Sequence, residues 1–596
     1  MNHNLGTSIL NLNWQQKTFD ERLAVAIRQK MELSDALSKI LAAKEIELDE
    51  IENFLDPKIK TNLPNPFELL DMQEAVAHVV EAIKLNKKIT IFADYDVDGA
   101  TSSALLKRFF REVGVDVGIY VPDRALEGYG PNTSALLNLK KSGTDLVITV
   151  DCGTVAFEPL EAAAKAGLEL IVIDHHIGVT EKPEALAVIN PNRIDEKFPH
   201  KNLCAAGVSF LFAVAVNKVL RDVGFYQEKK ISEPKLMQLL DLVALGTVCD
   251  VMPLTGVNRA FVAQGLKVLK ARENLGLRAI CDLAGLDEEP NSYHLGFILG
   301  PRINAGGRVG KSDLGARILS SEDEPEVQEI AMQLEEFNKQ RKEIETKIQE
   351  EAVAQLEKSV GGFGVNDSVI FAVSNSWHQG VIGIVASRLK DIYNKPVAVI
   401  TIKDGKGKAS CRSITGVDFG SAILQARLEG LLLEGGGHAM AGGFSVLEEK
   451  IPQLHKFFNE NLKEKVAEFG SKKDMFFAAA LDLPQVNIEL LKELSKLEPF
   501  GMGNSKPKFI IRDLQKVKAN LIGKTAEHIS CIFSYKTALG FSGNLQAVSF
   551  RSAGTALGDI LLDPKMTNPM NVAGQLNINS WMGVEKVQLL IEDVLI

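Results

Sequence analysis

Three short apolar runs constrain the fold of this chain more than any other feature, because each is rich in β-branched residues and leads into an aspartate. The runs are ITIFADYDVDG (89–99), LVITVDCG (146–153) and LIVIDHH (170–176). Helical patterns separate them, and strands that alternate with helices are typical of a doubly wound parallel sheet. The carboxyl ends of such strands meet at one edge of the sheet. The sequence therefore predicts an α/β fold whose acids gather at that edge as an active site.

The residue types at this edge indicate a divalent metal centre. Carboxylates together with imidazole favour Mn²⁺ or Mg²⁺, whereas structural zinc prefers thiolates in a closed tetrahedron. Cleavage of a phosphodiester needs an activated nucleophile and a sink for charge, and two ions about 3.5–4 Å apart supply both. We expect two ions that share one acid. The candidate ligands are Asp94, Asp96, Asp98, Asp151, His175 and Asp250.

Two other interpretations of these acids stay open from the residues alone. The stretch DYDVDG (94–99) matches the first half of an EF-hand calcium loop, but Leu105 stands where that loop requires a bidentate glutamate. A run of β-formers, rather than a helix, precedes it. The second alternative is that the acids only cap strand ends in ordinary turns.

Length and composition are those of a multidomain globular protein. The 596 residues exceed a single core and predict three or four domains. The polar N-terminal stretch lacks the layout of a signal peptide, and the longest apolar stretch (208–216) is shorter than the roughly 20 residues that span a bilayer. We therefore expect a cytoplasmic protein. The six cysteines form no CxxC pair, which favours reduced packing residues over a zinc ribbon or disulfides.

The net charge of −10 is unusual for a protein that binds phosphates, since nucleic-acid affinity depends on Lys and Arg. Part of the acidic excess belongs to the predicted metal site, and part to acidic helical segments at 45–56 and 322–351. A nucleic-acid function therefore requires a local basic lining. One candidate is the stretch KPKFIIRDLQKVK (506–518), for which a plain solvated strand face is the alternative.

Eight motifs in order along the chain resemble those of the DHH phosphoesterase superfamily, and their order is most similar to the RecJ family of single-strand-specific 5′-to-3′ DNA exonucleases. The motifs are FADYDVDGATS (92–102), VPDRALEGYG (121–130), VDCG (150–153), IDHH (173–176), GTVCDVMPL (246–254), GPRINAGGRVG (300–310), SWHQGVIGIVASRL (376–389) and GGGHAMAGG (435–443). The resemblance implies a metal-dependent exonuclease that releases 5′-mononucleotides from single-stranded DNA during repair and recombination.

The resemblance and the periodicity together predict an α/β multidomain chain of five segments. These are a helical N-terminal lead-in at 1–68, a parallel-sheet DHH catalytic domain at 69–320, a connecting helix at 321–360, a smaller α/β DHHA1 domain at 361–470 and an OB-like nucleic-acid-binding β-barrel at 471–596. Within the connecting helix, Arg341 falls on the apolar stripe. An isolated coiled coil is the alternative for this helix, but the stripe covers only about three or four heptads.

The resemblance also assigns roles at the metal site. It implies catalytic roles for Asp151, as the acid shared by both ions, and for His175 and His176. For His176, support of the ligands and direct contact with a substrate phosphate are both open. Asp94 is the least certain ligand, because Phe92 stands where the broader superfamily usually has a histidine.

Residues expected to contact the 5′-phosphate and the DNA backbone lie in four of the motifs and in a predicted hairpin at 403–413. A guanidinium can fork onto a phosphate, and glycines let backbone N–H groups approach an anion. The alternatives are solvated loop arginines and, for the two histidines, a packed core position. The predicted contacts are Arg124, Arg302, Asn304, Arg308, His378, Ser410, Arg412, Gly436 and His438.

The expected partner is single-stranded DNA, and the resemblance adds a single-strand-binding protein and a helicase as candidate protein partners. We expect a monomer without a membrane partner. Two rival functions are a DHH phosphodiesterase of short oligonucleotides or cyclic dinucleotides, and a non-catalytic replication scaffold. The first usually ends after the DHHA1 domain, whereas about 125 residues follow here, and the intact set of acids disfavours the second.

Overall fold

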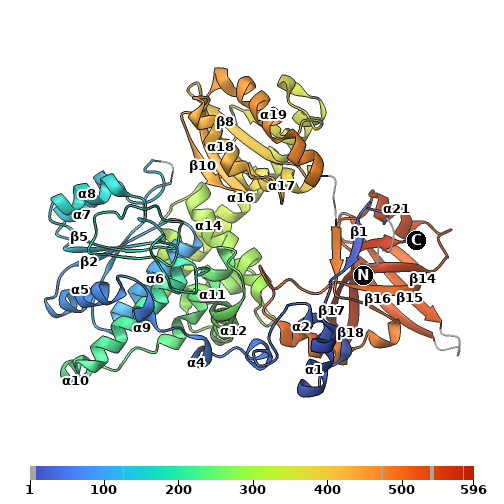
Figure 1. The fold of residues 1–596 in the computed structure, drawn as a ribbon, viewed down its shortest axis with the longest axis horizontal. Helices are drawn as coiled ribbons and strands as arrows, with labels where there is room; N and C mark the ends of the chain where they lie inside the picture. Colours follow the sequence, from blue (N-terminus) through green and yellow to red (C-terminus); the bar gives the residue numbers. More distant parts are fainter. Residues whose placement is uncertain (1–7, 125, 471–473, 537–541, 582) are drawn as a thin grey trace. The chain divides into compact units, whose positions relative to one another are not determined.

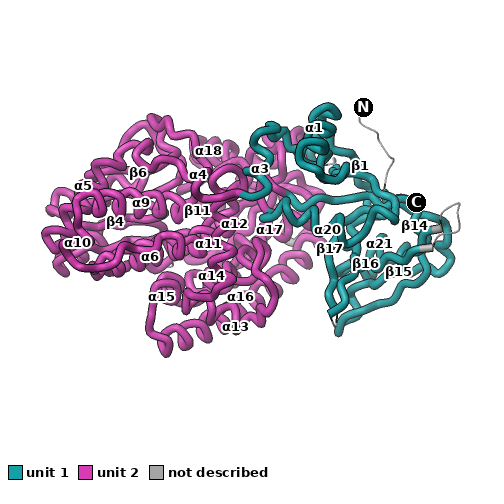
Figure 2. The backbone as a smooth tube through the Cα atoms, turned by 90° about the horizontal axis from the view of Figure 1, so that it is seen from below, with its two compact units in different colours: residues 1–56, 468–500, 505–596 teal, residues 57–467, 501–504 magenta. Residues whose placement is uncertain are grey.

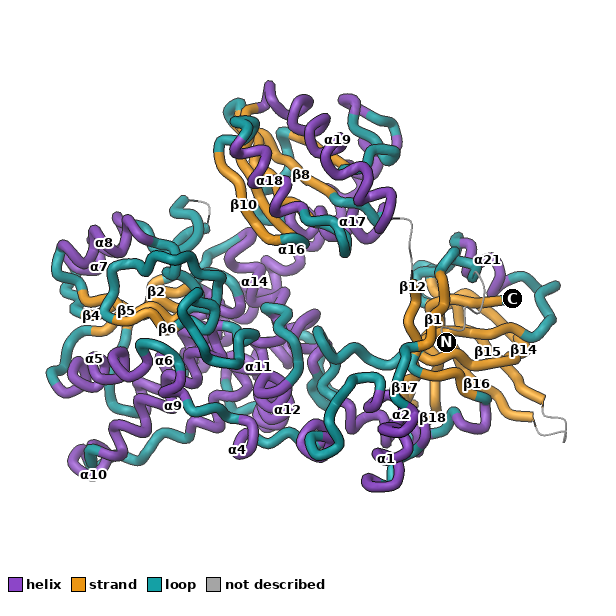
Figure 3. Tube along the Cα trace, in the orientation of Figure 1, coloured by secondary structure: helices purple, strands orange, loops and turns teal. Residues whose placement is uncertain are grey.

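The computed structural model describes residues 8–124, 126–470, 474–536, 542–581 and 583–596, and the chain divides into two compact units (Figure 2). The larger unit comprises 57–467 with 501–504, and the smaller comprises 1–56, 468–500 and 505–596. Figure 3 shows that helices dominate the larger unit and strands the barrel of the smaller one. No helix in the described ranges is both long and apolar enough to cross a membrane.

A five-stranded parallel sheet lies at the centre of the catalytic part, as the strand runs predict. Its order is β3-β2-β4-β5-β6, and every pairing is parallel. Ile91 of β2 packs in one hydrophobic cluster and its neighbour Phe92 in another, so both faces of the sheet are covered. The strands are β2 (Ile89–Ala93), β3 (Gly118–Tyr120), β4 (Leu146–Val150), β5 (Glu169–Ile173) and β6 (Ala187–Ile189).

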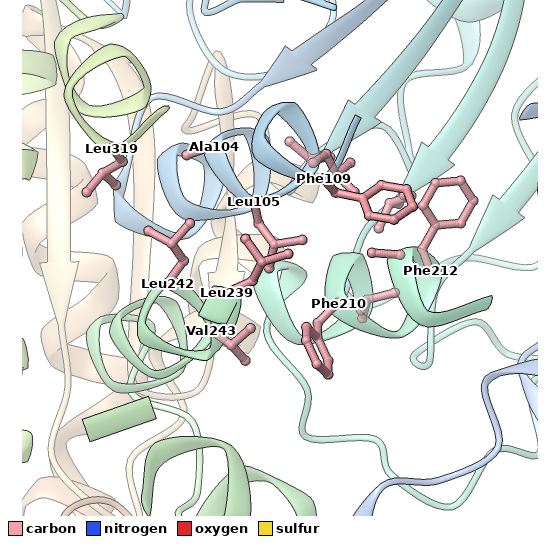
Figure 4. Packing of buried hydrophobic residues seen from close by; sticks show 14 of the residues in the cluster. Ala104, Leu105, Phe109, Phe210, Phe212, Leu239, Leu242, Val243 and Leu319 are labelled. Atoms are coloured by element: carbon pink, nitrogen blue, oxygen red, sulfur yellow. The ribbon is translucent and has the colours of Figure 1, made fainter. Parts of the chain in front are cut away.

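Helices cover both faces of this sheet, which is the doubly wound arrangement (Figure 1). Helix α6 begins within the first acidic motif, and its residues Leu105 and Phe109 pack among Phe210, Phe212 and Leu239 (Figure 4). The helices are α5 (Met72–Lys84), α6 (Val97–Glu112), α7 (Thr133–Lys141), α8 (Phe157–Lys165), α9 (Ala205–Asp222) and α10 (Phe225–Lys229).

A helical layer follows the sheet and contains the glycine-rich motif. We expected the glycines of GPRINAGGRVG to expose backbone N–H groups to an anion, but residues 300–309 form a helix instead. Its glycines permit close packing: a Cβ on Gly300 would lie 2.4 Å from the Cys249 sulfur. The helices are α11 (Leu240–Cys249), α12 (Gly256–Ala271), α13 (Leu275–Leu283), a π-helical turn (His294–Leu299), α14 (Gly300–Val309) and α15 (Leu314–Ser320).

The predicted connecting helix is present as α16 (Glu324–Glu357), with 34 residues. It packs against α13 and α14 on one side and against α17 (Ile382–Tyr393) of the next domain. Its buried stripe includes Leu334, Ile348 and Arg341. Because other helices of the larger unit cover this stripe, the alternative of an isolated coiled coil is wrong.

The second α/β domain contains a mixed five-stranded sheet in the order β10-β11-β9-β8-β7. Strands β8 and β9 form the predicted basic hairpin, with Asp404 and Gly405 at its turn. The strands are β7 (Ile370–Ser374), β8 (Val397–Lys403), β9 (Lys406–Arg412), β10 (Glu434–His438) and β11 (Ala441–Leu447), and helices α17, α18 (Phe419–Leu428) and α19 (Ile451–Gly470) pack on them.

The smaller unit is a closed β-barrel with added segments, as expected for an OB-like domain. Strand β14 pairs with both β15 and β17, which closes the ring β14-β15-β16-β18-β17. The strands are β12 (Asp474–Phe477), β13 (Ala479–Leu481), β14 (Phe509–Ile522), β15 (His528–Lys536), β16 (Ser542–Ser549), β17 (Met570–Trp581) and β18 (Val584–Leu595), with α20 (Ile488–Leu494) and α21 (Ala556–Leu562).

The N-terminal segment is part of this barrel unit. Strand β1 (Asn13–Gln16) pairs in parallel with β12, and the buried Trp14 indole donates a hydrogen bond to Asp593 at 2.8 Å. The residues that we expected to form a helical lead-in are broken into α1 (Glu21–Met31), α2 (Asp35–Ala42), α3 (Ile51–Leu55) and α4 (Ile59–Asn62). The first three contribute to the core beneath the barrel, whereas α4 lies in the larger unit.

Trp14→Ala is expected to destabilise the smaller unit by about 3–5 kcal/mol, since it removes a fully buried aromatic side chain and leaves Asp593 without its indole donor. Hydrogen exchange should accelerate in β12 and β18 but not in the parallel sheet of the larger unit. Trp14→Phe is the matched control, because it keeps most of the packing and should cost less. Equal exchange in wild type and Trp14→Ala would contradict this role.

Candidate active site

The predicted ligands meet at the carboxyl edge of the parallel sheet. Asp94 follows β2 and Asp151 follows β4, while Asp250 ends α11 and His175 follows β5. The His175 Nε2 atom lies 3.2 Å from an Asp151 oxygen, 3.5 Å from an Asp250 oxygen and 3.7 Å from an Asp98 oxygen. The structure therefore brings together residues from four separate motifs.

Three groups of side chains at this edge could each hold a metal ion, and they overlap. In each group the candidate ligand atoms lie within 4.8 Å of one another. Asp151 belongs to two groups, and so does His175. Two neighbouring ions with Asp151 between them fit this arrangement. The groups are Asp94 with Asp96 and Asp151; Asp98 with His175 and Asp250; and Asp151 with His175 and His176.

Unsatisfied atoms and charge support cation binding at this edge. Among the described residues, one oxygen each of Asp94 and Asp250 and the Nε2 of His175 are buried without a hydrogen-bond partner. Burial, together with the charge of neighbouring carboxylates, raises the pKa of Asp94 and of Asp250 to about 8. Burial and four nearby aspartates also raise the pKa of Asp151. A divalent ion would offset this repulsion, so the donor set fits Mn²⁺ or Mg²⁺.

Backbone N–H groups fix the two acids of the DVD stretch. Asp96 is the N-cap of α6, and its Oδ1 accepts from the backbone N–H groups of Asp98 at 2.8 Å and Gly99 at 3.1 Å. Asp98 is buried, and its two oxygens accept from the N–H groups of Ala205 and Ala206 at 2.6 and 2.9 Å. The first turn of α9 therefore orients Asp98 toward the metal edge.

Gly99→Ala is expected to lower turnover by about 100-fold, because a Cβ at this position would lie 2.3 Å from the Asp94 carbonyl oxygen and must displace the acidic turn. Steady-state cleavage of a single-stranded oligonucleotide measures the effect. Gly118→Ala on β3 is the control, since its Cβ makes only an ordinary contact 3.5 Å from Thr90. If both variants cleaved at the wild-type rate, the turn would not require glycine.

Asp174 is a site residue that the sequence reasoning missed. Its Oδ1 accepts from the backbone N–H of His175 at 2.7 Å and lies 2.8 Å from His176 Nδ1, while Oδ2 accepts from the Thr154 N–H at 3.0 Å. Burial opposes ionisation, but these hydrogen bonds outweigh it and lower the pKa of Asp174. These contacts fix the backbone of His175 and the ring of His176, and the place of Asp174 at the head of the DHH triplet was the available signal.

The position of His176 is compatible with both roles left open by the sequence. Burial lowers the pKa of its ring, but the hydrogen bond and charge of Asp174 outweigh that and raise it to about 9. The side chain is 47% exposed, so it can meet a substrate. It also belongs to a candidate ligand group. Tyr129, also missed from sequence, places its hydroxyl 3.3 Å from His176 Nδ1 and 3.1 Å from the Asp151 carbonyl oxygen.

Three predicted phosphate ligands form a second feature, which we call the arginine cluster: Arg124, Arg308 and Arg412. The Arg124 guanidinium lies 4.9 Å above the ring of Tyr95, within the acidic motif. Burial lowers the pKa of Arg308 to about 10, and the nearby positive charges of Arg124 and Arg412 contribute. In the part of the chain that the structure describes, none of the three pairs with a carboxylate. An unneutralised cluster of guanidiniums is suited to an anion such as phosphate.

Both α/β domains supply this cluster. Arg308 at the end of α14 donates to the Gly380 carbonyl at 3.0 Å. Arg412 on β9 donates to the Ser410 hydroxyl at 3.3 Å and to Ser387 at 3.1 Å. The predicted pair of Ser410 and Arg412 is therefore in direct contact.

The remaining predicted contacts differ in their surroundings. Arg302 is not a free cation, because it pairs with Glu335 at 2.5 Å, which the sequence could not indicate. His378 and His438 are exposed, so the alternative of packed core histidines is wrong for both. Gly436 lies exposed on β10, where a Cβ would meet no atom within 4 Å, and Asn304 is half-buried on α14.

Comparison with known families accounts for three parts of the chain. Residues 88–247 match the N-terminal domain of the DHH family, residues 366–464 match the DHHA1 domain and residues 477–593 match the RecJ OB domain. These matches agree with the order of parallel sheet, mixed sheet and barrel.

Whole-chain relatives have the same architecture. The chain is 30% identical over 589 residues to a Bacillus subtilis protein named single-stranded-DNA-specific exonuclease RecJ, covering 98% of this chain and 70% of that protein. It is 32% identical to the Haemophilus influenzae protein of the same name, covering 90% and 92%. A crystal structure of Thermus thermophilus RecJ with Mn²⁺ matches with a TM-score of 0.79 and 26% identity, over 98% of this chain and 79% of that one. The chain belongs to the RecJ family of DHH phosphoesterases.

Proposed function

We propose that this protein is a metal-dependent exonuclease specific for single-stranded DNA. The observation that carries this proposal is the overlap of the candidate ligand groups at Asp151 and His175, on one sheet edge. Two ions bridged by one acid are the arrangement that phosphodiester hydrolysis uses. Relatives that match over 90% or more of this chain have names that specify the same activity.

The residues present would hold two ions, Mn²⁺ or Mg²⁺, which would activate water and neutralise charge on phosphorus. Asp94, Asp96 and Asp151 would hold one ion. The second would lie with His175 and Asp250, beside Asp98. Solved relatives include RecJ structures with Mn²⁺ and with Mg²⁺.

His176 would act on the substrate side of this site. Its raised pKa keeps the ring charged near neutral pH, so Nε2 can donate a hydrogen bond to a phosphate oxygen. Asp174 and Tyr129 would hold the ring in place through the contacts at Nδ1.

We further propose that polarity arises from a terminal-phosphate site made by Arg124, Ser410 and Arg412. A 5′-phosphate carries more charge than an internal phosphodiester and suits a cluster of cations with a small hydroxyl donor. The enzyme would then advance from the 5′ end and release 5′-mononucleotides. The other proposed contacts with DNA are Arg302, Asn304, Arg308, His378, Gly436 and His438.

A substrate panel tests the proposed activity. The purified enzyme should degrade a 5′-phosphorylated single strand in Mn²⁺ or Mg²⁺ and leave a blunt duplex of the same sequence intact. Dinucleotides and cyclic dinucleotides test the rival phosphodiesterase, and should be poorer substrates than the long strand. Rapid cleavage of cyclic dinucleotides with an untouched long strand would reject the proposal.

Arg412→Ala is expected to raise the KM for 5′-phosphorylated strands by about 10- to 100-fold, since a charge-assisted contact to a terminal phosphate is worth roughly 1.5–3 kcal/mol. The KM for 5′-hydroxyl strands should change much less. Arg427→Ala, an exposed arginine on α18 of the same domain, is the control. Equal losses on both substrates would mean that Arg412 binds internal backbone or maintains the fold.

Partners beyond DNA rest on the family resemblance alone. We propose a single-strand-binding protein and a helicase as the proteins that would deliver single strands, and a monomer as the active form. Co-sedimentation with each purified protein, and the sedimentation coefficient of the enzyme alone, would test these points.

A further inference from the structure

A buried polar network on α16 lies beside the arginine cluster. Asn338, Arg341 and Glu345 are only 1%, 7% and 8% exposed, although they lie on the stripe of the helix that is otherwise apolar. Arg341 donates to Glu345 at 2.6 Å and to Asn338 at 3.0 Å. Glu345 also accepts from Arg388 of α17 at 3.2 Å. Arg388 is exposed, but burying the other three polar groups in a helix interface is costly, which favours a role beyond packing.

This network is physically connected to the position of Arg308. The end of α14 packs directly on α16, where a Cβ on Gly310 would lie 2.4 Å from the Phe337 ring. The segment just before α17 also packs closely on the end of α14, because a Cβ on Gly380 would lie 2.4 Å from the Arg308 carbonyl oxygen. Arg308 therefore lies where α14, α16 and α17 meet. The charge of Arg341 is also among the causes that lower the pKa of Arg308, after burial and Arg124.

The buried part of the network is incompletely satisfied. Two guanidiniums, those of Arg341 and Arg388, share the single carboxylate of Glu345. Among the described residues, the buried Arg341 Nε and Asn338 Nδ2 have no hydrogen-bond partner. A helix interface that served only stability would gain from apolar residues at these positions. The unpartnered donors of Arg341 and Asn338 favour instead a role beyond packing.

We propose that Arg341 and Glu345 are positioning residues for the terminal-phosphate site. Glu345 holds Arg341 on α16 and Arg388 on α17, and this link fixes Arg308 from one domain and Arg412 from the other toward the same phosphate. Arg341 adds positive charge behind that site without touching substrate. The inference rests on the proposed function, because it presumes that the arginine cluster binds a 5′-phosphate.

Arg341→Met tests this role in the full-length enzyme with 5′-phosphorylated and 5′-hydroxyl single strands. We expect the KM for the phosphorylated strand to rise about tenfold, with little change in its kcat or in the KM of the hydroxyl strand. Arg341→Lys keeps the charge but loses the fork, and should restore part of the preference for the phosphorylated strand. Arg317→Met is the matched control. It removes an exposed arginine of α15 that pairs with Glu326 of α16, and it should leave both KM values unchanged.

The outcomes separate this inference from the proposed function. If Arg412→Ala abolishes the preference for a 5′-phosphate and the Arg341 variants retain it in full, the positioning role is wrong and the phosphate site stands. If Arg412→Ala keeps the wild-type preference for a 5′-phosphate, the proposed phosphate site is wrong. Should Arg341→Met fail to fold, Arg341→Lys decides. The measured quantity is the ratio of the KM for the 5′-hydroxyl strand to the KM for the 5′-phosphorylated strand. A ratio equal to that of wild type overturns the inference, and a two- to threefold shift supports it.

Discussion

Asp151→Asn reduces turnover on single-stranded DNA by roughly three to five orders of magnitude and leaves the fold intact. The substitution removes the charge that two candidate ligand groups share, while its amide keeps the volume of the side chain. Single-turnover cleavage of a 5′-phosphorylated strand in Mn²⁺ measures the loss. Binding of the same strand, measured by fluorescence anisotropy, should change by less than about tenfold, because the proposed DNA contacts lie elsewhere.

Asp116→Asn is the matched control for this variant. Asp116 is an exposed acid just before β3, at the amino end of the sheet, so its charge cannot serve the metal edge. It should cleave at the wild-type rate. Turnover of Asp151→Asn within about tenfold of wild type would contradict a bridging role for Asp151.

Removal of divalent metal abolishes cleavage completely, and Mn²⁺ or Mg²⁺ restores it. The same addition should stabilise the larger unit, because ions that bind only the folded state at 100 times their Kd contribute about 2.7 kcal/mol. Differential scanning calorimetry of the chelated and reloaded protein measures this shift. Burial and mutual charge raise the pKa values of these carboxylates, and bound ions would relieve the repulsion between them.

Calcium provides the control for this experiment. Calcium prefers six to eight oxygen ligands, so it should stabilise the protein without supporting comparable turnover. Asp151→Asn should show a smaller thermal shift with Mn²⁺ than wild type. Cleavage that persists at the full rate in excess chelator would contradict a metal-dependent mechanism.

Much of the metal edge could be predicted from sequence because its signals are local. Strand runs such as 146–150 end at an acid, and parallel pairing then places their ends together. Asp174 heads the DHH triplet but was not predicted as a site residue, because its importance comes largely from hydrogen bonds to backbone groups. Likewise, Arg302 looks like a free cation in sequence, but its partner Glu335 lies on another helix.

The barrel unit shows a different limit of sequence reasoning. Pairing of β1 with β12 joins segments more than 450 residues apart, and nothing local indicates it. The basic stretch at 506–518 was predicted to grip DNA. Three of its lysines are held within the unit: Lys506 contacts Asn577, Lys508 pairs with Glu592, and Lys516 donates to three backbone carbonyls that include Leu561. Their contribution to DNA binding therefore stays a prediction.

The most direct test of the central claim follows a single strand with a 5′-phosphate and a label at its 3′ end, in Mn²⁺. A metal-dependent enzyme that enters at the 5′ phosphate and removes one nucleotide at a time should leave the label on progressively shorter strands until the end of the reaction. A blunt duplex of the same sequence should retain its full length. Immediate release of the label as a mononucleotide, or equal degradation of the duplex, would contradict the account.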